Sequence, residues 1–440
     1  MHRAANAHVT TRRSLLRAAA LGALATPFLA ACGDDAGQQP APESTEPVEL
    51  SMFWWGAEAR AKSTEDALKL YTAKYPFVTF KTTWQGNQGY YDKLATLAAG
   101  GNAPDIFQID DGALSEYAER GVTLDLNSYK SSGKLDVKKF PEGLWKYGEV
   151  GGKLSGVPTG ENTPGMIYNK QLCTELGIPE PTSGMSWEAL ITWAEQVWVK
   201  SGNKVYGTMD PSADYKALWV WLRQQGKELY NGKAVGATKE DLVKWFDLWQ
   251  GARDRKAAPT ADLIHEANGG DVTKQLVVTG KAATSFMWGN QIAELSKATK
   301  STLGVVTYPG DNKGQWARAA LYFSVAKSSA KRDRAVDVVN FLVNSPEVGK
   351  LWGTDRGLSS NLDVRKAVSD SLTDAVQKTA FAFETDLATK FGPAPQVPPK
   401  GHVKVRALLT THAESVQYAK ATSAAAADAF LKEANAALAA

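Results

Sequence analysis

The chain has 440 residues, of which 43% are hydrophobic and 22% are charged, and its formal net charge is +3. This composition is typical of a globular protein, and the length suffices for about two or three domains. No long basic cluster follows Arg17, so nucleic acid is excluded as a partner. With only two cysteines, Cys32 and Cys173, a disulfide framework is excluded as well, and we expect Cys173 to be a small buried core residue.

The first 31 residues have the order of an export signal. Arg12 and Arg13 form a basic pair, and residues 15–30 are apolar except for Arg17. This run is too short to span a bilayer, which needs ~20 residues, so residues 1–31 are predicted to be a cleavable signal peptide. The basic pair resembles a twin-arginine signal, while the general secretory route stays open. The alternative is an alanine-rich tail with a chance cysteine.

The segment Leu29-Ala30-Ala31-Cys32 resembles a bacterial lipobox. This resemblance implies cleavage before Cys32 and a diacylglyceryl thioether on its sulfur, with palmitate-type acyl chains. Two acyl chains anchor a protein stably, whereas a single chain is marginal. The protein is therefore expected on the outer face of a cytoplasmic membrane. Residues 32–47 are rich in Pro, Gln and acids, and we expect them to form a flexible tether.

Apolar runs and helical spacing alternate in the first part of the body. We expect strands at 50–55, 77–84 and 106–109, with helices at 64–75 and 90–99 between them. This order predicts a parallel sheet with helices on its faces. In such sheets ligands bind beyond the carboxyl ends of the strands. The residues at those ends are aromatic or polar; they are Trp55, Glu58, Arg60, Gln85, Asp110 and Asp111.

Later segments continue the mixed pattern. Helices are expected at 187–199, 213–225, 239–249, 334–343 and 424–439. A short strand is expected at 282–287, followed by a strand pair, 303–308 and 319–326, around the loop 309–314. Residues 391–399, "FGPAPQVPP", are expected to form an extended crossing.

Four blocks resemble the bacterial family-1 extracellular solute-binding proteins. They are Lys93 to Asp110, Gly151 to Leu172, "VTGKAATSFMWGNQ" and Ala335 to Trp352, and they occur in the family's order. The resemblance implies an α/β fold of two lobes around a ligand cleft, each lobe a mostly parallel sheet flanked by helices. The ranges it implies are 48–159 and 287–327 for the first lobe, and 160–286 and 328–440 for the second. Crossings near 158–164, 287–290 and 327–330 would act as a hinge.

The same resemblance implies a carbohydrate receptor of an ABC importer. Such a receptor captures a di- or oligosaccharide by cleft closure and delivers it to a permease. It is not an enzyme, needs no cofactor or metal, and is expected to be a monomer.

Sugar chemistry favours particular residue types in this chain. Aromatic rings suit the C–H faces of a pyranose, and charged or amide groups suit its hydroxyls. We expect Trp55, Trp288 and Trp316 to contact ligand, because they lie at strand ends or in loops. One of Trp219 and Trp221 is expected to line the cleft. The helical tryptophans are expected in the core; they are Trp193, Trp198, Trp245 and Trp249. The polar candidates not yet named are Glu161, Asn162, Asn290 and Arg356, with His402 as a weaker one.

Two other classes of protein are alternatives to a sugar receptor. Asp110 and Asp111 suggest a glycosidase pair, but neighbours on a strand point to opposite faces, and catalytic carboxyls must lie ~5–9.5 Å apart across one bond. The sequence also holds no hydrolase, phosphate-loop or Cys/His metal motif. A surface glycoside-active enzyme or a non-transport, adhesive sugar-binding lipoprotein remains the alternative. The sequence does not name the sugar.

Overall fold

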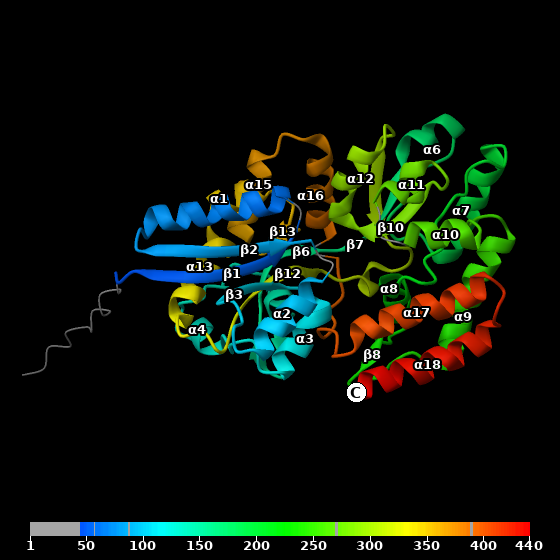
Figure 1. The fold of residues 1–440 in the computed structure, drawn as a ribbon. Helices are drawn as coiled ribbons and strands as arrows, with labels where there is room; N and C mark the ends of the chain where they lie inside the picture. Colours follow the sequence, from blue (N-terminus) through cyan, green and yellow to red (C-terminus); the bar gives the residue numbers. More distant parts are fainter. Residues whose placement is uncertain (1–44, 57, 87–88, 269–271, 388–389) are drawn as a thin grey trace, which may run out of the picture. The chain divides into compact units, whose positions relative to one another are not determined.

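A computed structural model describes residues 45–440 except 57, 87–88, 269–271 and 388–389. Residues 46–440 form one compact unit (Figure 1). The predicted signal peptide, Cys32 and most of the predicted tether lie outside the described residues. Within the described part of the chain, no helix combines the length and the apolar composition needed to cross a membrane.

A six-stranded sheet organises the first part of the unit. Its strands, in spatial order, are β13 (Leu358–Ser359), β6 (Val157–Asn162), β12 (Arg318–Val325), β3 (Ile106–Ile109), β1 (Val48–Trp55) and β2 (Val78–Gln85). Strand β1 pairs in parallel with β2 and β3, as the alternating pattern predicts. Strand β12 is antiparallel to β3 and β6, and β13 is antiparallel to β6. The prediction of a mostly parallel sheet is thus wrong for strands β6, β12 and β13, which pair in antiparallel fashion.

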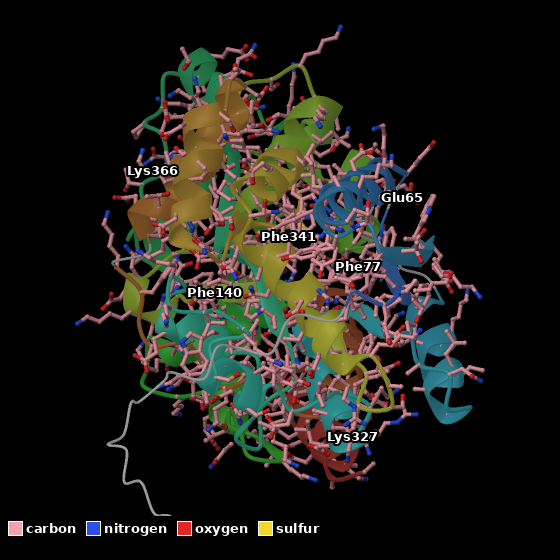
Figure 2. All side chains as sticks on the ribbon, turned by 90° about the vertical axis from the view of Figure 1, so that its left-hand side faces the viewer. Glu65, Phe77, Phe140, Lys327, Phe341 and Lys366 are labelled. Atoms are coloured by element: carbon pink, nitrogen blue, oxygen red, sulfur yellow. The ribbon has the colours of Figure 1, made fainter. Side chains whose placement is uncertain are left out.

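Helices and loops cover this first sheet. The helices are α1 (Glu58–Lys74), α2 (Tyr90–Ala99), α3 (Asp111–Glu119), α4 (Asn127–Ser131), α5 (Glu142–Lys146), α13 (Arg332–Asn344), α14 (Pro346–Trp352) and α15 (Leu362–Ser371), with the hairpin β4 (Glu149–Val150) and β5 (Lys153–Leu154). Val336 and Val339 of α13 share a core with Leu50 of β1. Phe341 and Phe77, which are labelled in Figure 2, pack against the same core. Residues 328–371 therefore pack with the first sheet, although the predicted ranges placed them in the second lobe.

A smaller sheet organises the rest of the unit. Its strands, in spatial order, are β10 (Thr284–Trp288), β7 (Pro164–Asn169) and β11 (Leu303–Thr307), and both pairings are antiparallel. The prediction of a mostly parallel sheet is wrong here too. The predicted pairing of 303–308 with 319–326 is also wrong. Residues 308–317 instead carry the chain from β11 in the second sheet to β12 in the first.

The second sheet is surrounded by the remaining elements. These are α6 (Lys170–Leu176), α7 (Trp187–Lys200), α8 (Tyr215–Arg223), the hairpin β8 (Tyr230–Asn231) and β9 (Ala234–Val235), α9 (Lys239–Asp254), α10 (Ala261–Asn268), η1 (Val272–Lys274), α11 (Leu276–Thr279), η2 (Gly289–Gln291), α12 (Ile292–Ala298), η3 (Asn312–Gly314), α16 (Ala375–Leu387), α17 (His402–Gln417) and α18 (Ser423–Ala439). The predicted extended segment 391–399 has no helix or strand.

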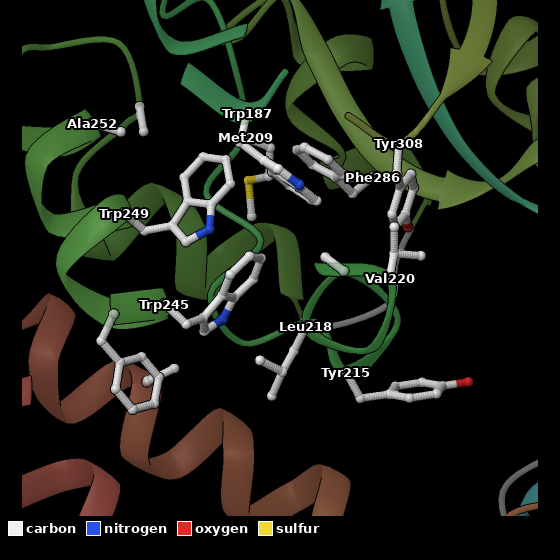
Figure 3. Close-up of a cluster of buried hydrophobic side chains, with 14 of the residues drawn as sticks. Trp187, Met209, Tyr215, Leu218, Val220, Trp245, Trp249, Ala252, Phe286 and Tyr308 are labelled. Carbon is white, nitrogen blue, oxygen red and sulfur yellow. The ribbon is translucent and has the colours of Figure 1, made fainter. Parts of the chain in front are cut away.

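Aromatic rings fill the core beside the second sheet. Trp187 meets Trp245 and Trp249 edge-on, with ring centroids 5.4 Å and 5.9 Å away, and Phe286 of β10 joins them (Figure 3). Large aromatic side chains bury much apolar area, which stabilises this core. The core prediction is confirmed for Trp193, Trp245 and Trp249, and Cys173 is buried as expected.

The predicted core position of Trp198 is only partly realised. Trp198 is half-buried and stacks on Tyr206, with ring centroids 4.6 Å apart.

One residue, Thr163, separates the strands of the two sheets where the chain first crosses. Its N–H donates to Glu384 Oε1 at 3.1 Å, and its carbonyl accepts from the N–H of Gly289 at 2.8 Å. A Cβ on Gly165 would lie 2.8 Å from the Gly289 Cα, so the close approach of the two backbones requires glycine. Both backbone polar groups of the buried crossing are thereby satisfied.

The chain changes sheets at one of the three predicted places. The first crossing lies inside the predicted range 158–164. The next is at residues 308–317 rather than 287–290, because β10 and α12 both stay with the second sheet. A further one, at residues 372–374, joins α15 to α16, whereas 327–330 stays beside the first sheet.

Glu384 is a buried acid beside this crossing. Burial is the main reason that its pKa is raised to about 8, and the nearby Glu161 carboxylate adds to the rise. Its Oε2 atom has no hydrogen-bond partner among the described residues. The protonated form is therefore the one that fits the fold.

We predict that Glu384→Gln removes a pH-dependent loss of stability. A raised carboxyl pKa gives stability that is complete below the pKa of the unfolded chain and is lost as the pH rises through about 8. Glutamine resembles the protonated acid, so at pH 9 the variant should be more stable than the parent by about 2–4 kcal/mol, and at pH 4 the two should be alike. Urea unfolding at both pH values measures this. Asp386→Asn, an exposed position on the same helix, should show no such trend. An equal difference at both pH values would contradict the prediction.

Candidate functional site

Trp288 and Arg318 meet at the first crossing. In the strand registers Arg318 is opposite Asn162, and Trp288 is opposite Pro164, so they flank Thr163 from the two sheets. The Arg318 guanidinium carbon lies 3.9 Å from the centre of the Trp288 ring. A guanidinium over an indole face is a favourable cation–π contact. The crossing therefore fixes the positions of an aromatic ring and a cation from different sheets.

The Arg318 side chain is held from behind by α3. It forms an ion pair with Asp111, and the Tyr147 hydroxyl donates to Asp111 Oδ2 at 3.3 Å. Burial opposes ionisation of Asp111, but Arg318 outweighs it, and the pKa of Asp111 is lowered. Asp110 accepts from the N–H of Ala113 at 3.1 Å, which confirms that one of the two aspartates caps the helix. With these roles the two carboxylates do not form a catalytic pair.

A cavity of about 590 Å³ lies beside Trp288. Its lining comes from the start of α8, the end of β10 and one face of α17. Members that matter here are Asp210, Asp214, Tyr215, Lys216, Phe286, Met287, Trp288 and Arg406. A concave site with an aromatic wall and a few charged groups is the usual form of a small-molecule site.

Charged groups converge on this cavity. Lys216 Nζ lies 2.8 Å from Asp214 Oδ2 and 5.4 Å from the centre of the Trp288 ring. The Tyr308 hydroxyl donates to Asp214 Oδ2 at 3.2 Å. Burial lowers the pKa of Lys216, although the Asp214 carboxylate opposes the change. The Arg406 guanidinium carbon lies 4.7 Å from the centre of the Tyr215 ring.

His402, the weaker candidate, is buried at the start of α17. Its Nδ1 lies 2.5 Å from the Tyr230 hydroxyl, and its ring packs edge-on against Tyr215 at 4.9 Å. Burial lowers its pKa to about 3, with Arg406 and Arg318 contributing. His402 is therefore a neutral packing residue behind the cavity wall rather than part of the lining.

A second cavity, of about 860 Å³, lies beneath residues 393–397. It is lined by α5, by the β4–β5 hairpin and by this proline-rich segment. Among its described lining residues, Tyr147 alone is aromatic. We therefore favour the smaller cavity beside Trp288.

Five predicted site residues do not line the cavity beside Trp288. Trp55 is buried against Tyr90 at 5.0 Å. Arg60 Nε pairs with Asp355 Oδ2 at 2.8 Å. Arg356 is buried and donates to Thr64 Oγ1 at 2.7 Å. Glu58 is exposed at the start of α1, and Gln85 is half-buried at the end of β2.

Two predicted tryptophans belong to the core. Trp219 and Trp316 are 2% and 1% exposed, and their ring centroids are 5.0 Å apart. Trp219 Nε1 donates to Glu228 Oε2 at 2.6 Å. Their burial leaves no face for a ligand, so we leave both out of the site.

The remaining predicted residues line the crossing itself. Glu161 is buried and pairs with Arg365 at 2.6 Å, which assigns it a structural partner. Asn162 and Asn290 each keep a buried side-chain oxygen without a hydrogen-bond partner among the described residues. Both oxygens are buried and neither residue lines the cavity beside Trp288, so the structure does not bring Asn162 and Asn290 into that site.

Sequence reasoning missed several residues of this group. Arg318, Asp214, Tyr215, Lys216 and Arg406 were not singled out. The N-cap signal at Asp214, whose side chain accepts from the N–H of Lys216 at 2.8 Å, was readable in the sequence. Arg406 offered no signal, because α17 itself was not predicted. No group of three or more potential metal ligands occurs among the described residues.

Comparison with known proteins identifies the family. A family model described as "bacterial extracellular solute-binding protein" matches residues 66–384, which is more than half of the chain. The chain belongs to this family of solute-binding proteins. The family resemblance noted in the sequence is thereby confirmed.

Two relatives of this solute-binding protein have curated names. An arabinooligosaccharide-binding protein of Halalkalibacterium halodurans is 26% identical over 198 residues, which span 43% of this chain and 43% of the relative's length. An uncharacterized lipoprotein of Streptomyces antibioticus is 24% identical over 412 residues, covering 89% of this chain and 87% of that protein.

A solved structure shows the same fold. It is a family-1 extracellular solute-binding protein from Alicyclobacillus acidocaldarius, with 26% identity and a TM-score of 0.73, covering 90% of this chain and all of that one. The α/β, two-lobed fold predicted for the solute-binding protein is thereby confirmed.

We predict that the Asp111–Arg318 pair is required for the stability of the solute-binding protein. Asp111→Asn leaves a buried guanidinium without its counter-charge, which should lower the free energy of unfolding by about 3 kcal/mol. Urea unfolding at pH 7 measures the loss. Asp363→Asn removes one partner of the exposed pair with Lys139 and should cost less than about 1 kcal/mol. Equal costs for the two variants would show that the buried pair has no special role.

Proposed function

We propose that this solute-binding protein is the extracytoplasmic receptor of an ABC importer. It captures a di- or oligosaccharide in the cavity beside Trp288, the two lobes close on the sugar, and the closed form delivers it to the permease. Hinge closure of two domains around a ligand is a known mode of conformational change. The observation that carries the proposal is the position of Trp288, at the first crossing between the sheets and in the wall of the cavity.

The chemistry of the cavity suits a sugar. The Trp288 ring offers a flat apolar face for the C–H groups of a pyranose. Lys216 and Arg406 offer charged donors for the oxygens of hydroxyls around its rim. The name of the arabinooligosaccharide-binding relative supports an oligosaccharide as the ligand class.

We also propose where the receptor works. The lipobox-like segment supports a lipid anchor on Cys32, which holds a monomeric receptor on the outer face of the cytoplasmic membrane near its permease. Export by the twin-arginine or the general secretory route precedes anchoring. One relative carries the name lipoprotein, which supports this placement.

Replacing Trp288 tests the binding site. Trp288→Ala should weaken sugar binding by about 1–3 kcal/mol, the value of burying one large apolar side chain, which is about ten- to hundredfold in Kd. A thermal-shift panel of di- and oligosaccharides finds the ligand, because tight binding raises the melting temperature. Titration calorimetry of the parent and the variant then gives the change in Kd.

Trp193→Ala is the matched control, because Trp193 is a buried core residue. Trp193→Ala should lower the melting temperature and leave the sugar affinity of the folded protein unchanged. A large loss of melting temperature in Trp288→Ala with unchanged affinity would move the site elsewhere. Assaying the bound sugar for cleavage separates the receptor from a glycoside-active enzyme, which would release shorter products.

The anchor is tested by Cys32→Ala in the full chain. Without the thioether, the exported protein should leave the membrane fraction or keep its signal peptide. Fractionation and intact-mass measurement show which. A variant that is exported, processed and still bound to the membrane would contradict the lipid anchor.

A further inference from the structure

The described carboxylates that line the cavity beside Trp288 already accept hydrogen bonds from the protein. Asp214 accepts from the Lys216 ammonium and the Tyr308 hydroxyl. Asp210 is buried, pairs with Arg253 and accepts from the N–H of Ser212 at 2.7 Å. Asp214 therefore has little acceptor capacity left for the hydroxyl hydrogens of a ligand, and Asp210 is only 1% exposed.

The Asp111 carboxylate behind the cavity is committed in the same way. It pairs with Arg318 and accepts from the Tyr147 hydroxyl. Thus the acids in and behind the cavity lining pair with cations of the protein.

The donors around the same cavity are in surplus. Arg318 lies behind Trp288 rather than in the lining, and its buried Nε atom has no hydrogen-bond partner among the described residues. Arg406 lines the cavity, and within the described part of the chain its guanidinium contacts the Tyr215 ring without an acidic partner. Lys216 has three ammonium hydrogens, and it donates to the Asp214 carboxylate.

We infer that the natural sugar carries a carboxylate, as a uronic acid residue does. This inference rests on the proposed function and names the class of its substrate. A uronate combines the C–H face that suits Trp288 with an anionic group that accepts from guanidinium and ammonium donors. A planar carboxylate also matches the fork of an arginine, so Arg406 can bind both oxygens at once.

A neutral sugar satisfies this cavity less well. Its hydroxyls need acceptors as often as donors, and the lining acids are already engaged. The surplus of donors therefore favours an acidic ligand over a neutral one of the same size.

Matched pairs of sugars test the inference. The probes are dimers and trimers of galacturonic, glucuronic and mannuronic acid, each beside its methyl ester, which keeps the ring and removes the charge. Arabino- and gluco-oligosaccharides complete the panel. At least one acid should bind the parent protein about tenfold or more tightly than its ester, since hydrogen bonds to charged groups are the stronger ones. Raising the salt concentration should weaken that binding.

Arg406→Gln assigns the preference to the cavity. It should weaken binding of the acid by about tenfold and leave binding of the ester within about twofold. Lys404→Gln is the matched control, because Lys404 is exposed on the same helix and does not line the cavity. It should change neither affinity.

The outcomes separate the inference from the proposed function. If an ester or a neutral oligosaccharide binds as tightly as every acid, the acidic-sugar inference is wrong and the receptor function stands. If Arg406→Gln weakens acid and ester alike, the charge preference does not come from Arg406 and the inference fails. If no sugar of the panel binds, the proposed function and the inference fall together.

Discussion

The two sheets depend on one buried crossing in which a single residue separates their strands. Thr163 cannot pair within either sheet, yet its backbone groups must be satisfied away from water. Glu384 of α16 and Gly289 of η2 supply the partners. Because the registers on both sides of Thr163 are fixed, Trp288 and Arg318 are brought face to face. The proposed site is thus a consequence of how the backbone passes from sheet to sheet.

Electrostatics at the crossing follow from the same burial. Glu384 is held in its neutral form mainly because it is buried, and its free oxygen has no hydrogen-bond partner among the described residues. Asp111 is held ionised because Arg318 lies against it. One acid therefore stays neutral beside the crossing while another balances a cation near the cavity. Burial dominates the pKa of Glu384, whereas for Asp111 a neighbouring cation outweighs burial.

The local sequence pattern predicted most individual helices and strands. The errors concern which strands pair, because pairing depends on residues far apart in the chain. Strand β3 and helix α2 have the predicted bounds, because turn residues and helical spacing mark their ends. The partner of β11 could not be read locally, since a strand's partner depends on where the whole chain returns. The same holds for the site. Trp288 was predicted because it ends a strand, whereas Arg406 was missed because its helix, α17, was not predicted. Burial decided the fate of Trp316, and no local signal reports burial of a loop tryptophan.

The most direct test is a crystal structure of the solute-binding protein with the sugar that raises its melting temperature most. A pyranose ring stacked on Trp288, with its polar groups within hydrogen-bond distance of Lys216 or Arg406, is the predicted result. The ring should occupy the cavity of about 590 Å³ and contact its lining from α8, β10 and α17. Sugar density in the cavity beneath residues 393–397 instead, with Trp288 untouched, would contradict the assignment of the site.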